Sequence, residues 1–573
     1  MDSIKARGLF QLSLMALAVG VIAGLGAWIF RLLIGFFHNL LFLRTISLDY
    51  DANYHTPTDV WGVWVIAIPM VGALGVAWLV KTFAPEAKGH GVPEVMDAIH
   101  YNDGRIRPVV VVVKSLASAI SIGSGGSVGR EGPIIQIGAT FGSVLGQWIA
   151  MPLRQRALLM AAGAGAGIAA TFNAPLGGIL FAVELLLVSV NAQSILIVSI
   201  ATITATAIGR YLLGAAPAFD IPALQIPHFD VGSLWGLLAL LPLGLVCGFV
   251  AAVFIRAIYW AEDRFDAMPG NYYTRHLTGM FLVGVMIYLL QRYSGHFYVQ
   301  GVGYATIVDI LNNVLGDPSF LLLLVLLKLT ATCLTLGSGA SGGVFSPSLF
   351  MGAALGATFG QGVSALFPGL EIGIAAYAIA GMAAMIGAST GAVFTSIVML
   401  AEMTEDHNAI LPVVLCVASA YALRKRICPP SIYTLKLNRR GHRVPEGLCA
   451  AISAAQWLGD IASRDFAARE AGTPPPPEPG VVLWTQAGNI TAVERRFLSP
   501  DRPEEPPIGA GPVRFLCLPA DCILVEALRA MKAQDAQVIL VSKDPAGGRA
   551  ADVVGVVTAA ELAGAMQSGA EMM

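Results

Sequence analysis

The sequence predicts an all-α polytopic membrane protein built from two inverted repeats, followed by a small cytoplasmic α/β domain. Three observations support this prediction: long apolar runs, a Gly-rich segment that occurs twice, and a change of composition near residue 445. We expect the transmembrane domain over residues 1–444, with repeats at about 10–220 and 230–440, and the small domain over residues 445–573.

Apolar residues form runs long enough to cross a bilayer. The 573-residue chain is 56% hydrophobic and only 13% charged, whereas soluble domains carry roughly 25% charged residues. A membrane helix needs about 20 predominantly apolar residues. The first run is too long for the apolar part of a signal peptide, so we expect it to remain as a helix. The runs cover residues 9–37, 61–83, 193–213, 232–256, 277–290, 319–336 and 409–423.

One Gly-rich segment is repeated. Residues 123–142 (GSGGSVGREGPIIQIGATFG) and residues 337–356 (GSGASGGVFSPSLFMGAALG) share nine of twenty residues, at an offset of 337 − 123 = 214. Gly/Pro breaks at matching places in two apolar halves indicate a transport site between repeats, near the middle of the membrane. Two further blocks repeat at similar offsets: residues 89–99 with 301–311 (301 − 89 = 212) and residues 162–184 with 380–402 (380 − 162 = 218).

Basic residues predict the orientation. Lys5 and Arg7 precede the first run. Because basic residues concentrate on the cytoplasmic side of membrane proteins, we expect a cell-membrane protein with both termini in the cytoplasm. An even number of crossings in two repeats fits an odd number in each, and the repeats would then be inverted. The basic residues that follow the last run are Arg424, Lys425, Arg426, Lys436, Arg439, Arg440 and Arg443.

The residues after Pro445 have the pattern of a small soluble domain. Residues 473–480 (TPPPPEPG) form a Pro-rich linker that cannot be helical. Residues 522–534 have helical apolar spacing, whereas residues 538–541 and 553–557 are β-branched runs typical of strands.

Three Gly-rich segments predict an anion site. Gly89–Pro93, Gly123–Pro133 and Gly337–Pro347 each lead directly into an apolar helix. Helix N-termini present unpaired N–H groups and the positive end of the helix dipole, which favour an anion. The alternative is that the glycines only allow close helix packing. That alternative fits residues 161–167 (AAGAGAG) but does not explain the Ser, Arg and Glu of residues 123–133.

Glu131 is the candidate gate. A carboxylate at membrane depth is costly when unpaired and indicates function. Arg130 could be an ion-pair partner, but consecutive helical residues do not face each other. We favour a carboxylate that occupies the anion site itself and leaves it on protonation.

Together these segments resemble the CLC family of chloride channels and transporters. The resemblance covers roughly residues 10–441. It implies an inverted-repeat membrane domain, a homodimer with one pore per subunit, and chloride as the substrate. The motifs that carry it are GSGGSVGREGP (123–133), GGVFSP (342–347), GHGVPE (89–94), NAPLGGILFAVE (173–184), LAEMT (400–404) and SIYTLKLNRRG (431–441).

The resemblance also assigns site residues. Glu131 falls on the family's external gating glutamate, and Tyr433 on a tyrosine whose hydroxyl holds the central anion. The chloride-binding residues implied are His90, Gly129, Arg130, Gly132, Val344, Phe345 and Tyr433, with Val344 and Phe345 acting through their backbone amides.

Two positions depart from the family pattern. His90 replaces the usual serine or proline of the first loop, and its imidazole could either face the anion or turn away from it. Exchangers of the family usually carry a second acidic residue where this chain has Leu185. Leucine cannot relay protons, so the sequence favours a channel. The adjacent Glu184 matches Glu402 in the other repeat, which suggests a shared role at a helix end.

The tail resembles a CBS module over residues 518–562, with a degraded first copy beginning at 457–466. Such modules can bind adenine nucleotides, although no phosphate-binding loop is recognisable, and structural support is the simpler role.

The sequence therefore predicts a channel-like chloride conductor gated by protonation of Glu131. A proton-coupled chloride antiporter is the alternative, and a membrane sensor with vestigial ion flux is a third possibility. A net charge of −2 gives no reason to expect a nucleic-acid partner. We expect no cofactor, no metal site and no enzymatic activity, because the seven cysteines and nine histidines lack ligand spacing and no nucleophile–base pattern occurs.

Overall fold

The protein is described by a computed structural model, which divides into two compact units. One unit comprises residues 1–187 and 192–446, and the other comprises residues 447–573 together with Val188–Asn191. The described residues are 7–58, 60–214, 237–368, 373–405, 410–442, 444, 458–474, 480–497, 508–522, 524–544, 548–558 and 561–562.

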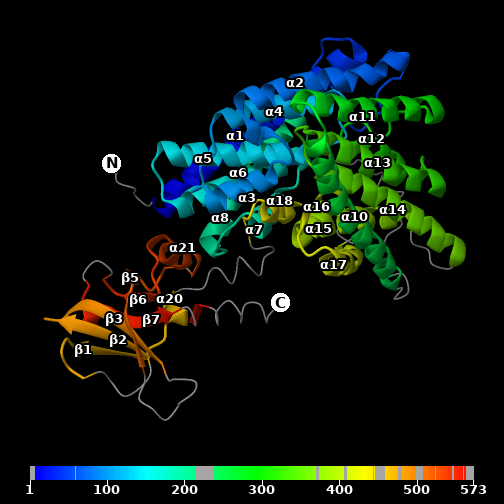
Figure 1. The fold of residues 1–573 in the computed structure, drawn as a ribbon. Coiled ribbons are helices and arrows are strands. Elements are labelled where there is room, and N and C mark those ends of the chain that lie inside the picture. The colour runs from blue at the N-terminus through cyan, green and yellow to red at the C-terminus, as the bar shows by residue number, and fades with distance from the viewer. Residues whose placement is uncertain are drawn as a thin grey trace. The chain divides into compact units, whose positions relative to one another are not determined.

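The first unit is helical throughout its described part (Figure 1). Its first half contains α1 (Leu9–His38), α2 (Ala67–Phe83), α3 (Val92–Tyr101), α4 (Val109–Gly123), α5 (Glu131–Trp148), α6 (Leu153–Phe172), α7 (Pro175–Leu185) and α8 (Ala192–Leu213). Its second half contains α10 (Leu240–Ala267), α11 (Tyr272–Ser294), α12 (Tyr304–Leu311), α13 (Pro318–Ser338), α14 (Phe345–Leu366), α15 (Ile374–Thr390), α16 (Val393–Thr404), α17 (Ile410–Ile427) and α18 (Ile432–Arg439).

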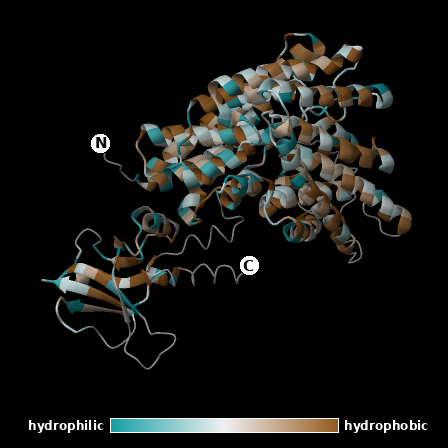
Figure 2. Ribbon diagram, in the orientation of Figure 1, coloured by the Kyte–Doolittle hydropathy of each residue, from teal (hydrophilic) through white to brown (hydrophobic). Residues whose placement is uncertain are grey.

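Among the described residues, seven helical segments are long and apolar enough to span a membrane. Six of them coincide with predicted apolar runs, and Figure 2 shows how strongly hydrophobic residues dominate this unit. The seventh is α14, which the sequence analysis divided between the repeated Gly-rich segment and the residues after it. The predicted run 409–423 lies in α17, whose last turn carries three basic residues.

Glycines let helices of each half approach to backbone contact. Gly138 of α5 and Gly163 of α6 face each other, and a Cβ on either would lie 2.1 or 2.2 Å from the other's carbonyl oxygen. Gly352 of α14 and Gly381 of α15 have the same relation, with both distances 2.3 Å. The small-residue explanation of residues 161–167 therefore describes real packing, and it recurs in the second half.

Equivalent residues of the two halves make reciprocal contacts. Both carboxylate oxygens of Glu402 accept backbone N–H groups at the start of α7, from Leu176 (3.0 Å) and Gly177 (2.7 Å). Glu184 accepts the corresponding groups at the start of α16, from Phe394 (3.2 Å) and Thr395 (3.0 Å). Reciprocal contacts of this kind are what a two-fold relation between repeats produces.

The second unit is a small α/β structure. Its strands are β1 (Phe466–Glu470), β2 (Gly480–Gln486), β3 (Asn489–Phe497), β4 (Ile508–Val513), β5 (Phe515–Leu518), β6 (Val538–Ser542) and β7 (Val553–Thr558), and its described helices are α20 (Leu458–Ile461) and α21 (Leu524–Gln534).

Two sheets form, with strand orders β1-β2-β3-β4 and β5-β6-β7. The predicted helix and the two predicted strands correspond to α21, β6 and β7. Ile539, Val541 and Val557 of the smaller sheet share a buried core with Leu524. The four-stranded sheet was not predicted, because only the start of a degraded module was recognised there. Residues 475–479 of the Pro-rich linker lie outside the described part.

Candidate functional site

The two copies of the Gly-rich segment meet inside the helical unit. Gly129 donates its N–H to the carbonyl of Gly343 (2.8 Å), and Gly343 donates back to Gly129 (2.7 Å). The two glycines occupy the same place in the repeat, since 129 + 214 = 343. This pair of bonds sets the N-terminal ends of α5 and α14 against each other, so both helix N-termini converge on one place.

Glu131, the first residue of α5, occupies that place and is completely buried. Its Oε1 accepts a hydrogen bond from the Tyr304 hydroxyl (2.6 Å) and a short one from the Ser346 hydroxyl. Its Oε2 accepts the backbone N–H of Ser346 at 3.3 Å. The carboxylate is thus held by donors from α12 and from the first turn of α14, much as a bound anion would be.

Arg130 does not pair with this carboxylate. Its guanidinium lies over the ring of Tyr304 at 5.2 Å and over that of Phe172 at 5.9 Å. The described residues contain no ion pair between Arg130 and Glu131. The cation instead packs on the aromatic ring whose hydroxyl holds Glu131, an arrangement worth about 0.5–2 kcal/mol.

The loop before α3 forms another side of the site. Gly89 and Gly91 have positive φ values of 80° and 87°. A Cβ on Gly132 would lie 2.1 Å from the carbonyl oxygen of His90, so the loop backbone touches α5 directly beside Glu131. Lys114 of α4, fully buried, donates to the carbonyls of Gly89 (2.8 Å) and Ala87 (3.0 Å).

Lys328 of α13 repeats this arrangement in the second half. It donates to the carbonyls of Val299 (3.1 Å) and Gly301 (2.9 Å), just before α12. Because α12 begins with Tyr304, the ammonium fixes the loop from which the donor to Glu131 extends. Both lysines were missed in the sequence analysis, although their separation, 328 − 114 = 214, equals the repeat offset.

His90 is 3% exposed, and its buried Nδ1 has no hydrogen-bond partner among the described residues. Its ring meets that of Tyr259 edge-on, with centroids 6.2 Å apart. The Tyr259 hydroxyl donates a short hydrogen bond to the carbonyl of Ile432, the residue before Tyr433. Tyr259 of α10 therefore connects the histidine loop to the start of α18.

The remaining candidates are all buried. Val344 is the residue before α14 and Phe345 its first residue, with 1% and 2% exposure, and Tyr433 is 2% exposed in the first turn of α18. A capping box formed by Ser431 and Thr434 fixes the start of α18. These positions surround the helix N-termini at the site, but the amide that contacts the Glu131 carboxylate is the next one, that of Ser346.

Leu185 and Glu184 end α7. The Glu184 carboxylate accepts hydrogen bonds from the first turn of α16, including one from the Thr395 hydroxyl at 2.8 Å. These contacts match the predicted helix-end role of Glu184. Its carboxylate is therefore not free to replace the acidic residue that is missing at position 185.

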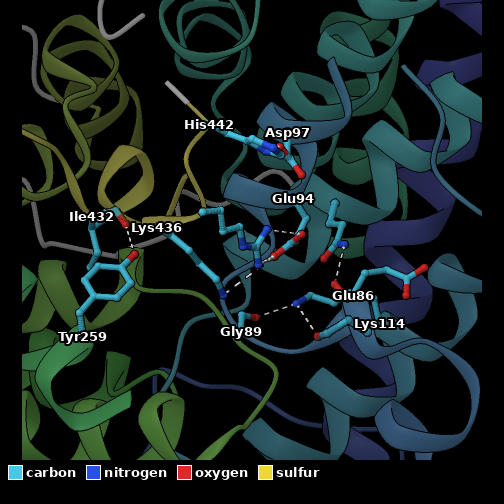
Figure 3. A network of polar contacts seen from close by, with 12 residues as sticks. Glu86, Gly89, Glu94, Asp97, Lys114, Tyr259, Ile432, Lys436 and His442 are labelled. Atoms are coloured by element: carbon cyan, nitrogen blue, oxygen red, sulfur yellow. Dashed lines mark hydrogen bonds and ion pairs between the residues drawn. The ribbon is translucent and has the colours of Figure 1, made fainter. Parts of the chain in front are cut away.

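A charged hollow of about 490 Å³ lies beside the histidine loop. Figure 3 shows part of its wall, where Glu94 of α3 pairs with Arg440 (2.6 Å) and Lys436 (3.9 Å). Burial raises the pKa of Glu86, but hydrogen bonds from Arg107 outweigh this and hold that pKa below its usual value. The hollow is lined by Pro85, Glu86, Lys88, Glu94, Tyr259, Glu262, Asp263, Asp266, Lys436, Arg439 and Arg440.

Sequence reasoning also missed Tyr304 and Ser346. Both lie in repeated blocks, in GVGY (301–304) and GVFSP (343–347). The signal that could have identified them is a difference between the two copies of each block. Tyr304 corresponds to Val92 in the first half, and Ser346 corresponds to Gly132.

A buried carboxylate held among helix N-termini, between two related halves of an apolar helical unit, defines the class: an integral membrane protein built from two structural repeats. Comparisons with known proteins identify the family. The family model described as voltage gated chloride channel matches residues 72–425. This chain therefore belongs to the CLC family, and it is a multi-pass integral membrane protein.

Two curated relatives illustrate the similarity. The H(+)/Cl(-) exchange transporter ClcA of Vibrio campbellii is 34% identical over 447 residues, covering 75% of this chain and 90% of the relative. The putative chloride channel protein ClcB-like of Ralstonia nicotianae is 34% identical over 356 residues, covering 61% of this chain and 80% of the relative.

Solved structures agree on the fold. A slow cyanobacterial Cl−/H+ antiporter superposes with a TM-score of 0.65 at 26% identity, covering 76% of this chain and 99% of that one. A eukaryotic CLC transporter at 20% identity has a TM-score of 0.62 and covers 96% of this chain and 97% of that one, which shows likeness of fold alone.

Proposed function

We propose that this protein exchanges chloride for protons across the membrane, with Glu131 as the group that both ions use. The observation that carries the proposal is the position of the Glu131 carboxylate, buried and bonded to Tyr304 and to the first turn of α14. An ionised Glu131 carboxylate in the anion-binding site excludes chloride. Protonation neutralises the carboxylate, weakens these charge-assisted hydrogen bonds and makes the site available to chloride.

The proposed anion ligands follow from the same geometry. The backbone of Gly129, Arg130 and Gly132 and the amides of Val344 and Phe345 lie at the two converging helix N-termini. The hydroxyl of Tyr433 and the imidazole of His90 would complete the inner part of the path. No lysine or arginine is needed within it, because helix ends supply the positive potential.

The choice of an exchanger over a channel rests on the relatives. The sequence favoured a channel because of Leu185, yet the Vibrio relative is named an H(+)/Cl(-) exchange transporter and the cyanobacterial structure an antiporter. The exchanger, which the sequence analysis kept as its alternative, is the better supported of the two. The channel remains the competing hypothesis, since the Ralstonia relative is named a putative chloride channel protein.

Family membership extends the proposal to assembly and location. We propose a homodimer with one anion path per subunit, in the cell membrane, with both termini in the cytoplasm. Lys5 and Arg443, which contribute to the orientation argument, lie outside the described residues. The described residues of the second unit give no support for an adenine nucleotide there, so we propose no ligand for it.

The deciding experiment is a coupled flux measurement. Purified protein in liposomes receives an outward chloride gradient, while chloride efflux and external pH are recorded together. An exchanger drives protons inward against a proton gradient, at a fixed ratio to chloride. Chloride efflux with passive proton movement alone would establish the channel and reject the exchanger.

A further inference from the structure

An exchanger needs a proton path from the inner solution to Glu131, and the usual relay position is Leu185. The neighbouring Glu184 is fully engaged at the start of α16. Protons cross an apolar interior only along titratable groups or ordered water. A substitute for Leu185 would therefore be another buried or half-buried titratable group, ordered water, or both.

Glu262 of α10 differs from the other carboxylates of the hollow. Glu86 pairs with Arg107, Glu94 with Arg440, Asp263 with Arg439 and Asp266 with Lys88 and Arg275. Across the described part of the chain, Glu262 has neither an ion pair nor a hydrogen bond to its side chain. Within this set, Glu262 is therefore the carboxylate that can gain and lose a proton without breaking an ion pair or a hydrogen bond.

Glu262 also lines a second, much smaller space. This gap holds about 10 Å³ and is bounded by Lys88, Gly89, His90, Ile258, Glu262, Leu336, Gly337 and Lys436. That volume corresponds to about one water molecule. Because Glu262, Lys88 and Lys436 line both spaces, the gap connects the hollow to the histidine loop.

His90 lines this gap together with Glu262. It is 3% exposed, and its Nδ1 has no hydrogen-bond partner within the described part of the chain, as expected for a group that a water or an anion would satisfy. Imidazole can accept a proton on one nitrogen and release one from the other, so it can pass protons without reorganising the backbone. Its own backbone carbonyl touches α5 at Gly132, next to Glu131.

We propose that Glu262 and His90 form the inner proton route, one that coincides with the anion path. This inference rests on the proposed exchange function. Glu262 takes a proton from the hollow and passes it through one water to His90. The imidazolium then releases the proton to water in the anion path, which passes it to the ionised Glu131 carboxylate at the other end of the site, and His90 returns to its neutral form. Each transfer moves one proton and no electrons.

The charges around His90 make this route dependent on chloride. Lys88 and Lys436 share its gap, Lys114 holds the same loop, and Arg440 lines the adjoining hollow. Glu262 is the carboxylate that lines the same gap, and Tyr259 is the aromatic neighbour of the imidazole. Four cations disfavour an imidazolium. An anion beside His90 offsets them, so chloride and proton should bind here together.

The transport test compares Glu262→Gln with Asp266→Asn in the full-length protein in liposomes. Both variants remove one negative charge from α10 at the hollow, but Asp266 does not line the gap. We expect Glu262→Gln to keep chloride efflux and to lower uphill proton movement at least about tenfold, less than the 10²-fold of a strict acid–base group because water substitutes in part. Asp266→Asn should keep the wild-type ratio.

The outcomes separate the two proposals. Wild-type protein that moves chloride but never drives protons uphill overturns the exchange function, and this route with it. Wild-type protein that drives protons uphill, with Glu262→Gln equally competent, overturns the inner route alone. Loss of both ions in Glu262→Gln, with Asp266→Asn normal, would assign Glu262 to the anion path and likewise overturn the proton role.

Calorimetry tests His90 without transport. Chloride is titrated into Glu131→Gln protein near pH 6 in buffers of different ionisation enthalpy, which counts the protons taken up on binding. We expect uptake in Glu131→Gln and none in the Glu131→Gln, His90→Gln double variant. Equal uptake in both, or no uptake in either, would remove His90 from the route.

Discussion

Tyr304→Phe should make the gate open at higher pH. The Tyr304 hydroxyl lies 2.6 Å from Oε1 of Glu131, and both groups are fully or nearly fully buried. Deleting it removes one of the three donors that hold the ionised carboxylate in the anion-binding site and leaves the ring in place. The protonated gate depends less on this bond, so the substitution favours the open state.

The size of the shift follows from the strength of the bond. A hydrogen bond to a charged group contributes about 1.5–3 kcal/mol. Since about 1.4 kcal/mol corresponds to one pH unit, the midpoint of acid activation should rise by about one to two units. The assay is chloride efflux from liposomes over a range of pH, fitted for its midpoint. Ser346→Ala, which removes the other hydroxyl, should shift it in the same direction.

Tyr377→Phe is the matched control. Tyr377 of α15 is another fully buried tyrosine, and its hydroxyl makes no hydrogen bond to any residue that the structure describes. Its removal should leave the midpoint unchanged. A pH profile of Tyr304→Phe that superimposes on the wild-type profile would refute the argument. It would show that the hydrogen bond from Tyr304 does not stabilise the ionised Glu131 carboxylate.

Two further predictions concern carboxylates. Glu131→Gln and Glu131→Ala should abolish acid activation, because no ionised group then competes for the anion-binding site; a wild-type pH profile in either would place the gate elsewhere. Glu184→Gln and Glu402→Gln should each lower the free energy of unfolding in detergent by a similar amount, about 1–3 kcal/mol, because each leaves a helix N-terminus imperfectly capped. Neither should alter the proton-to-chloride ratio, and a ratio change in Glu184→Gln alone would restore it as a relay.

The sequence predicted the features that depend on local pattern. Apolar length located most of the long helices, and the repeated glycines located the place where α5 and α14 meet, since Gly129 and Gly343 bond to each other. The partners of Glu131 could not be predicted in this way. Tyr304 and Ser346 reach it from 173 and 215 residues away, and such distant contacts leave no periodicity in the sequence.

For Leu185 and His90, the sequence shows the residue but not its consequence. A missing acid is visible in the sequence, but its consequence depends on which other titratable groups surround the site. Only the structure shows that Glu184 is used as a cap and that His90 shares a water-sized gap with Glu262. A channel was the reasonable conclusion from Leu185 alone, and it assumed that no second route existed.

Comparison of the repeats separates scaffold from function. Where the halves match, the shared residues build the frame: Lys114 and Lys328 hold loops, Glu184 and Glu402 cap helices, and Gly129 and Gly343 join the halves. The side chains of the gate and its surroundings stand where the halves differ: Glu131 opposite Phe345, Ser346 opposite Gly132, Tyr304 opposite Val92 and His90 opposite Val302.

A symmetric frame brings two helix N-termini together, but by itself it would offer the anion the same environment from both sides of the membrane. The unmatched side chains make the two approaches different. Glu131, with its hydroxyl donors, stands at one end of the site, and His90, with the charged hollow behind it, stands at the other. In this chain the difference between the two approaches arises from a few substitutions between otherwise equivalent loops.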